Sequence, residues 1–310
     1  MKAIRLFALS LLLALTASPV LARKPAPALP PATHATVVTD DGLPLALWSR
    51  SAAQPTRTVL LVHGRTWSAR PNFDLQTPEG DRSVLKDFAE RGYAAYAVDL
   101  RGYGDSPRDA SGWITPDRAS ADVAQVLQWI QRQHPGLPAP ALVGYSQGAA
   151  VALLTAQRAP QAMSALVLYG FAADVDAPPK DQPTPAQPPR AKTTAQAAGE
   201  DFVVESAFTP QLRDAYVAQA LASDPIRNDW RSASQFVFTP ETVQAPTLLI
   251  RGAQDGYNTQ DKYARLFLRL GSEDKRWVTL PKSDHVAHVE NTHDAWMAAI
   301  TEFIARPQVR

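Results

Sequence analysis

The sequence predicts an α/β fold, with a mostly parallel sheet of eight strands, helices on both faces and a cap inserted late in the chain. Several strand-like runs are continuously apolar, such as VLLV at 59–62 and YAAYAV at 93–98, which is typical of strands covered on both faces. Helical patterns separate these runs, and this alternation favours right-handed crossovers and a parallel sheet. One long segment, 173–243, interrupts the alternation.

Local signals bound the expected elements along the chain. Gly92, Pro135, Pro160 and Gly271 each follow a helical pattern, in the place where glycine and proline usually end helices. The expected strands are 35–39, 43–48, 58–63, 93–100, 141–145, 165–169, 247–251 and 276–280. The expected helices between and after them are 83–91, 116–134, 147–158, 259–270 and 292–304.

The interrupting segment 173–243 begins with a proline-rich, charged stretch at 174–190 (DVDAPPKDQPTPAQPPR). Helix-like pieces follow at about 193–207 and 210–222. A compact domain seldom carries so long a loop without function, so a cap or lid over the site is expected. A disordered surface insertion is the alternative for the proline-rich half.

The N-terminus has the features of a signal peptide. Lys2 and Arg5 precede an apolar run at 6–15, and Val20-Leu21-Ala22 offers a cleavage site after Ala22. The run is shorter than the ~20 residues that span a bilayer. We therefore expect a signal peptide at 1–22, an extended linker at 23–33 and export to the periplasm or medium. The α/β core is expected at 34–172 and 244–310.

Composition limits the partners that the protein can be expected to bind. Apolar residues make up 45 % of the 310, and the formal net charge is +1. This balance gives no reason to expect nucleic acid or an anionic membrane as a partner. No cysteine is present, which excludes lipoprotein attachment and disulfides, so we expect no stable membrane anchor. A small-molecule substrate is the expected partner, and no cofactor is expected.

Gly144-Tyr145-Ser146-Gln147-Gly148 fits the pattern G-x-S-x-G, with a strand before Ser146 and a small-residue helix after it. This order of strand, sharp turn and helix is the nucleophile elbow, in which the serine hydroxyl projects at the carboxyl edge of the sheet. The helix N-terminus favours negative charge that develops there. Ser146 is therefore the predicted nucleophile, and a structural serine in a tight turn is the alternative.

A serine nucleophile needs a base and an acid that orients it. His285 follows the last strand-like run, where the order Ser, acid, His along the chain places the base, and His288 is the alternative. Asp255 directly follows the strand at 247–251, so its carboxylate can reach the imidazole from the same sheet edge. Its rivals are Asp174, Asp176 and Asp284.

The loop after the strand at 58–63 is the candidate oxyanion loop. The backbone amide of Arg65, together with that of Gln147, can stabilise an oxyanion. His63 precedes the nucleophile and is interpreted as a structural histidine that holds this loop. Trp67 is expected at the pocket as a substrate contact, as is Tyr145, and Arg65 and Arg70 near its mouth could bind a substrate carboxylate or an aromatic group.

Two further motifs are not assigned to catalysis. Asp99 and Arg101, within DLRGYGDS at 99–106, are expected to form a structural polar network near the site. His285, His288, Glu290 and His293 are rich in possible metal ligands, but their spacing matches neither H-E-x-x-H nor H-x-x-E-H. We therefore expect no metal.

Taken together, HGRTW (63–67), DLRGYGDS, GYSQG, RGAQD (251–255) and SDHVAHVE (283–290) resemble the α/β-hydrolase superfamily in order and spacing over residues 34–310. The chain is most similar to small bacterial esterases and lysophospholipase-like hydrolases. The resemblance implies an α/β-hydrolase fold, a triad of Ser146, Asp255 and His285, oxyanion amides on Arg65 and Gln147, and a cap at 173–243. Arg65 stands where small or apolar residues are more usual, and the cap is unusually rich in proline, so the substrate class stays open.

The expected function is hydrolysis of a carboxylic ester through an acyl-enzyme on Ser146. A proline-selective aminopeptidase of the same fold is one alternative. A non-catalytic binding protein that keeps the fold is the other.

Overall fold

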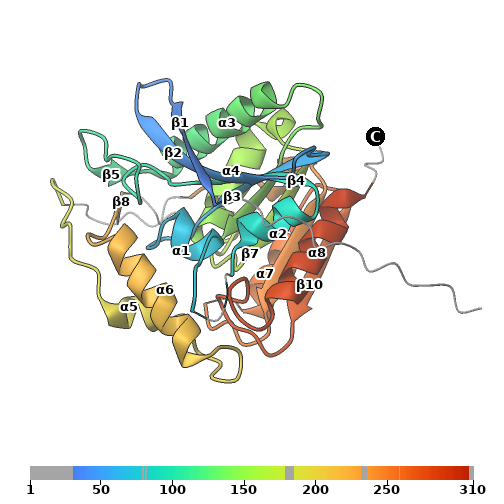
Figure 1. The fold of residues 1–310 in the computed structure, drawn as a ribbon. Coiled ribbons are helices and arrows are strands. Elements are labelled where there is room, and N and C mark those ends of the chain that lie inside the picture. The colour runs from blue at the N-terminus through green and yellow to red at the C-terminus, as the bar shows by residue number, and fades with distance from the viewer. Residues whose placement is uncertain are drawn as a thin grey trace, which may run out of the picture.

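The structure is a computed structural model that describes residues 31–78, 80, 82–178, 185–231, 236–257 and 259–306. A sheet in the order β1-β2-β4-β3-β6-β7-β9-β10 crosses the molecule (Figure 1). β2 runs antiparallel to both of its neighbours, and every other pair is parallel, so the predicted eight-stranded, mostly parallel sheet is confirmed. The strands are β1 (Thr33–Val38), β2 (Pro44–Ser51), β3 (Arg57–Val62), β4 (Tyr93–Val98), β6 (Ala141–Tyr145), β7 (Ala165–Tyr169), β9 (Thr247–Gly252) and β10 (Lys275–Leu280).

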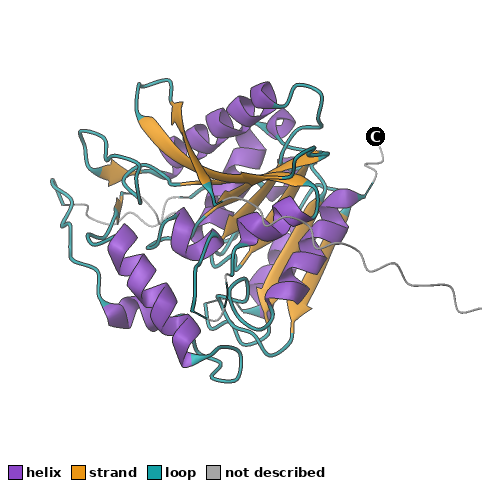
Figure 2. Cartoon of the chain, viewed as in Figure 1, coloured by secondary structure: helices purple, strands orange, loops and turns teal. Residues whose placement is uncertain are grey.

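Helices cover both faces of this sheet, as predicted (Figure 2). Apolar side chains of α3, α4 and α7 share one buried cluster with the strands, and those of α2 and α8 share the other. Ser83 and Thr115 accept hydrogen bonds from amides of the first turns of α2 and α3, which shows why these helices begin there. The core helices are α2 (Val84–Glu90), α3 (Pro116–Gln133), α4 (Gln147–Arg158), α7 (Gln260–Arg269) and α8 (His293–Ala305).

A smaller group of elements lies beyond the end of the sheet. α5 (Ala195–Gly199) and α6 (Pro210–Ser223) lie side by side at the lower left of Figure 1. α6 packs against the short helix α1 (Ala69–Phe73), and β5 (Trp113–Ile114) pairs with β8 (Asp229–Trp230). α1, β5 and β8 were not predicted, because elements of two to five residues carry no periodic pattern.

The helix expected at about 193–207 is wrong beyond Gly199, since α5 ends there. The amides of Val203 and Val204 turn away and donate to the carboxylate of Asp284, at 2.7 and 2.9 Å. Amides engaged in this way cannot continue the helical ladder. The residues after α5 are therefore held by the core of the molecule instead of by their own helix.

The N-terminal predictions lie largely outside the described residues. The signal peptide at 1–22 lies wholly outside them, as does most of the linker at 23–33, whose last residue, Thr33, begins β1. Among the described residues, no helix combines the length and the apolar character needed to span a membrane.

Candidate active site

Ser146 lies in the sharp turn between β6 and α4. Its φ of 54° and ψ of −120° are angles that a residue with a side chain rarely adopts. Close packing holds the turn: a Cβ on Gly144 would lie 2.4 Å from the carbonyl oxygen of Gly148, and a Cβ on Gly148 would lie 2.3 Å from that of Val62. Both glycines of G-x-S-x-G are thus needed for the backbone to approach so closely.

His285 and Asp255 form a hydrogen-bonded chain with Ser146. His285 Nε2 lies 2.8 Å from Ser146 Oγ, and His285 Nδ1 lies 2.7 Å from Asp255 Oδ2. The three residues follow β6, β9 and β10, so they meet at the carboxyl edge of the sheet. The structure therefore brings together the three residues that the sequence analysis selected, with the connections of a Ser-His-Asp triad.

The imidazole of His285 is buried and surrounded by carboxylates. Burial opposes its protonation, but the hydrogen bond and charge of Asp255, with added charge from Asp201 and Asp284, outweigh burial and raise the pKa of His285. The environment therefore favours the imidazolium form of His285.

His288, the alternative base in the sequence prediction, makes no hydrogen bond to Ser146. It is fully buried, and among the described residues neither of its ring nitrogens has a hydrogen-bond partner. Burial lowers its pKa well below the ordinary value, so the ring is neutral. It packs 4.6 Å from the ring of Tyr145 and 5.9 Å from that of Trp296, and so supports the site from beneath.

The rival acids are engaged elsewhere. Asp174 and Asp176 both form ion pairs with Arg265. Asp284 accepts hydrogen bonds from the amides of Val203 and Val204, and it also accepts one from the amide of Val286 at 3.1 Å. Among the acids that the sequence analysis weighed, Asp255 is the one that bonds to His285.

Tyr169 connects Ser146 to the loop after β10 that contains His285 (the histidine loop), a role that was not predicted from the sequence. Its carbonyl accepts from the amide of Ser146 at 2.8 Å, and its hydroxyl donates to the carbonyl of His285 at 2.6 Å. The only signal in the sequence was a tyrosine at the end of an apolar strand.

His63 fixes the loop that follows β3. Its Nε2 accepts from the amide of Leu100 at 3.1 Å, so its Nδ1 carries the hydrogen that is donated to the carbonyl of Gly64, at 2.8 Å. Burial lowers the pKa of His63 to about 4, which keeps the ring neutral. The hydroxyl of Tyr103 donates to the carbonyl of Arg65. These contacts give His63 the structural part that its sequence position predicted.

The amides of Arg65 and Gln147 are available beside the nucleophile. Gln147 is the first residue of α4, so its amide has no acceptor within the helix. Within the described chain the amide of Arg65 has no backbone acceptor either. A Cβ on Gly64 would lie 3.2 Å from Ser146 Cβ, so the loop runs directly past the nucleophile. Both residues line the same cavity as Ser146.

This cavity has a volume of about 410 Å³, which suits a small molecule. Trp67 and Tyr145, the predicted substrate contacts, both line it. Arg70 is not among its lining residues, because its guanidinium lies over the ring of Trp48, 4.8 Å from the centroid. The lining also includes polar residues that were not selected from the sequence, among them Glu200, Asp201, Arg227 and Tyr257.

Two carboxylates attach the residues around α5 and α6 to the core. Asp224, which follows α6, accepts from the amides of Ser68 and Gly104, at 2.8 and 3.0 Å. Asp284 accepts from Val203 and Val204, as described above. Because Asp284 directly precedes His285, the second attachment ties this segment to the histidine loop.

Asp99 and Arg101 form two polar networks and do not bond to each other. Asp99 is buried and accepts from the amide of Ala69 at 2.8 Å and from Trp48 Nε1 at 3.0 Å. Its network reaches the loop of the candidate site, whereas that of Arg101 lies beside α3. Arg101 forms ion pairs with Asp41, Asp109 and Asp122.

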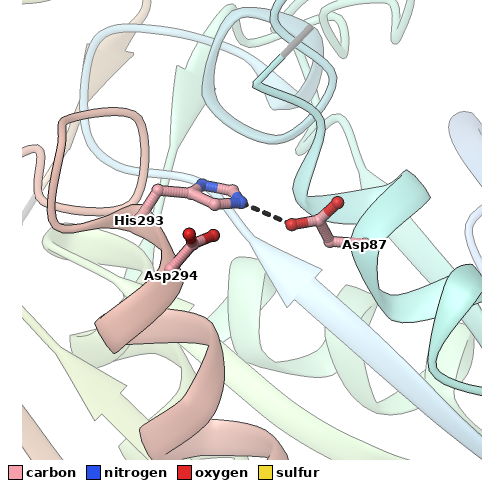
Figure 3. A group of neighbouring side chains, drawn as sticks. All are labelled: Asp87, His293 and Asp294. Atoms are coloured by element: carbon pink, nitrogen blue, oxygen red, sulfur yellow. Dashed lines mark hydrogen bonds and ion pairs between the residues drawn. The ribbon is translucent and has the colours of Figure 1, made fainter.

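One group of possible metal ligands occurs among the described residues, and it lies on α2 and α8. Figure 3 shows the ring of His293 pointing at Asp87, with Asp294 beside it. His293 Nε2 lies 2.7 Å from Asp87 Oδ2, and Nδ1 faces the carbonyl of His288. Each ring nitrogen of His293 thus already faces an acceptor. The side chain links α8 to α2 through Asp87, and it has no free imidazole lone pair to offer a metal.

Glu290 is a fully buried carboxyl group beneath the histidine loop. Burial, followed by the charge of Asp284, raises the pKa of Glu290 to about 9, from an ordinary 4.5. Between these two values the folded protein keeps a proton that the unfolded chain has released. Stability therefore falls as pH rises through that window.

Replacing Glu290 by glutamine should flatten this dependence, because the neutral amide keeps the shape of the protonated acid. Between pH 5 and pH 8, we expect the free energy of unfolding to change less for Glu290→Gln than for the wild type. The two changes should differ by on the order of a few kcal/mol. Urea unfolding at both pH values measures it. The exposed Glu302→Gln serves as a control that keeps the wild-type slope, and equal slopes for Glu290→Gln and wild type would contradict the assignment.

Comparison with known proteins places this geometry among hydrolases. The family model described as serine aminopeptidase, S33, matches residues 53–292. Among solved structures, a hydrolase from Pseudomonas aeruginosa is 21 % identical (TM-score 0.63, covering 88 % of this chain and 98 % of that one). A thermophilic esterase from Thermogutta terrifontis is 18 % identical (0.62, 88 % and 98 %), and an epoxide hydrolase from Vigna radiata 16 % (0.62, 88 % and 98 %). Likeness at such identities concerns the fold alone.

Proposed function

We propose, from the premise that the chain belongs to the serine aminopeptidase S33 family within the α/β-hydrolase superfamily, that it cleaves a carboxylic ester through an acyl-enzyme on Ser146. The observation that carries the proposal is the hydrogen-bonded chain from Ser146 Oγ through His285 to Asp255. It lies at the wall of a cavity that has room for a small substrate.

In the proposed reaction, Ser146 Oγ attacks the ester carbonyl carbon while His285 Nε2 takes the hydroxyl proton. The carbonyl π electrons move onto oxygen, and the amides of Arg65 and Gln147 donate to that oxyanion. When the oxyanion collapses, the bond to the alcohol oxygen breaks and His285 gives its proton to that oxygen. Water then repeats the sequence on the acyl-enzyme, which releases the acid and restores the serine.

Asp255 has two parts in this proposal. It holds the His285 tautomer whose Nε2 can accept a proton, and it stabilises the imidazolium. Asp201 and Asp284 add negative charge around the same ring, which supports the assignment of His285 as the base.

Amide hydrolysis is the second candidate, and the position of two acidic residues in the cavity bears on it. Glu200 and Asp201 place carboxylates in the lining, and such groups can bind the N-terminal ammonium of a peptide. That ammonium would belong to the acyl part of the substrate. His285, however, must protonate the leaving group. Asp201 lies on the imidazole side of Ser146, because it is hydrogen-bonded to Tyr257, whose ring lies 4.8 Å from that of His285. The carboxylates are thus beside the leaving group, which favours the ester.

A panel of para-nitrophenyl esters of increasing acyl length, run beside a proline arylamide, separates the two candidates. We expect hydrolysis of short esters, because a cavity of about 410 Å³ limits the acyl chain, and none of the arylamide. Initial rates at neutral pH provide the measurement. Turnover of the arylamide without turnover of any ester would contradict the ester proposal.

A further inference from the structure

Two arginines, Arg65 and Arg227, line the cavity that contains Ser146. Arg65 comes from the loop after β3, and Arg227 comes from the segment between α6 and β8. Within the described part of the chain, neither guanidinium group makes a hydrogen bond or an ion pair. Two such groups at the wall of a concave site are well suited to bind an anion, because guanidinium matches a carboxylate in charge and geometry.

The two charges act on each other. Partial desolvation, followed by repulsion from Arg227, lowers the pKa of Arg65, although Arg65 is exposed at the mouth of the cavity. The carboxylate of Asp229 offsets only part of this repulsion: it acts on Arg65 at a distance and accepts a hydrogen bond from the amide of Arg190 at 3.0 Å. An anion bound by both guanidinium groups would offset this repulsion. The pair of like charges is therefore better explained as a site for an anionic ligand than as a contact that stabilises the fold.

The opposite side of the cavity is acidic. Asp201 is hydrogen-bonded to Tyr257, whose ring lies 4.8 Å from that of His285. Glu200 also acts on Tyr257 through its charge. The neighbours of Arg65 are a different set, which includes Asp229 and Tyr103, whose hydroxyl donates to the carbonyl of Arg65. The cavity thus has a basic side and an acidic side, with the imidazole on the acidic side.

The reaction geometry decides which part of the substrate meets each side. His285 Nε2 delivers a proton to the alcohol oxygen, so the alcohol lies on the imidazole side, and the acyl chain points to the other. We propose that the acyl part of the substrate carries a carboxylate, held by the guanidinium groups of Arg65 and Arg227. This inference rests on the proposed ester hydrolysis and adds the substrate class: short monoesters of dicarboxylic acids.

Three esters of matched size test the proposal on the full enzyme. Ethyl pentanoate is neutral, monoethyl glutarate has the charge on the acyl side, and the pentanoate ester of glycolate has it on the alcohol side. Titration of the released acid gives kcat/KM for each. We expect monoethyl glutarate to be preferred over ethyl pentanoate, with an advantage that shrinks as sodium chloride is added, because salt screens exposed charges.

The variant Arg227→Gln should lower kcat/KM for monoethyl glutarate about tenfold or more, the usual effect of losing a hydrogen bond to a charged group, and change ethyl pentanoate less than about twofold. Arg70→Gln is the matched control. It removes an arginine from the same region whose side chain lies over Trp48, so all three esters should keep their rates.

Two results would overturn the proposed carboxylate site but leave ester hydrolysis standing. One is an equal kcat/KM of the wild type for monoethyl glutarate and ethyl pentanoate. The other is a loss of kcat/KM in Arg227→Gln that appears with the glycolate ester instead of monoethyl glutarate. Failure of all three esters, together with failure of a fluorophosphonate to label Ser146, would remove the proposed function itself. Hydrolysis of ethyl pentanoate therefore separates the two kinds of failure.

Discussion

The variant Ser146→Ala should lose turnover of every ester that the wild type cleaves, with kcat reduced by about a millionfold. Alanine leaves the cavity and the fold intact but removes the oxygen that attacks the carbonyl carbon. The remaining residues cannot substitute for it, because the members of such a triad act as a unit. Initial rates on a short ester, measured at a protein concentration high enough to detect slow turnover, provide the test.

Ser272→Ala is a suitable control for this variant. Ser272 is a buried serine that lies just before β10, at the amino end of that strand, and its hydroxyl donates to the carbonyl of Asp274. The control should keep wild-type activity. A Ser146→Ala enzyme with more than a small fraction of the wild-type kcat would show that another group performs the reaction.

The variant Asp255→Asn should lower kcat by about ten-thousandfold while leaving the serine and imidazole in place. An amide cannot stabilise the imidazolium, and its NH₂ group can favour the wrong tautomer of His285. Asp174→Asn is the matched control, since Asp174 is a neighbouring acid that pairs with Arg265 instead. If the two variants lose the same activity, the role of Asp255 is wrong.

The pH profile gives a second readout of the same residue. Activity requires neutral His285, whose pKa is raised, so the acid limb of kcat/KM in the wild type should lie above the ordinary histidine value of 6.5. Activity is therefore lost as pH falls through that limb. Removing the charge of Asp255 lowers the pKa of His285, and the limb of Asp255→Asn should move to lower pH.

The centre of the fold could be predicted because its central strands are buried on both faces. Continuous apolar runs identified several of these strands, and β6 and β7 were predicted with their observed bounds. Glycine and proline located the ends of the core helices to within one or two residues. The order of strand and helix then determined which loops share the carboxyl edge of the sheet.

The three candidate triad residues could be predicted for the same reason. Each of the three directly follows a predicted strand or lies in the short loop after one. Because these strands are parallel, their carboxyl ends lie at the same edge of the sheet, and the three residues meet there. The pattern favoured His285 and left His288, three residues further on, as the alternative. The surroundings of the two rings decide between them, because His288 is enclosed by aromatic rings whereas His285 bonds to Ser146 and lines the cavity.

The residues that give the cavity its charge could not be predicted. Asp201 and Arg227 lie in the segment that joins β7 to β9, where proline and short elements replace the regular alternation. Their positions depend on anchors from the core, such as the carboxylates of Asp224 and Asp284, that link residues far apart in the chain. Periodicity carries no information about contacts of this kind.

The most direct measurement of the central claim is to locate the covalent adduct of a fluorophosphonate probe by mass spectrometry of peptides from the wild-type enzyme. We predict one stoichiometric adduct, on the peptide that contains Ser146, with the mass of the phosphonyl group after loss of fluoride. An unmodified Ser146 in an enzyme that still hydrolyses esters, or an adduct on a different residue that abolishes activity, would contradict the account.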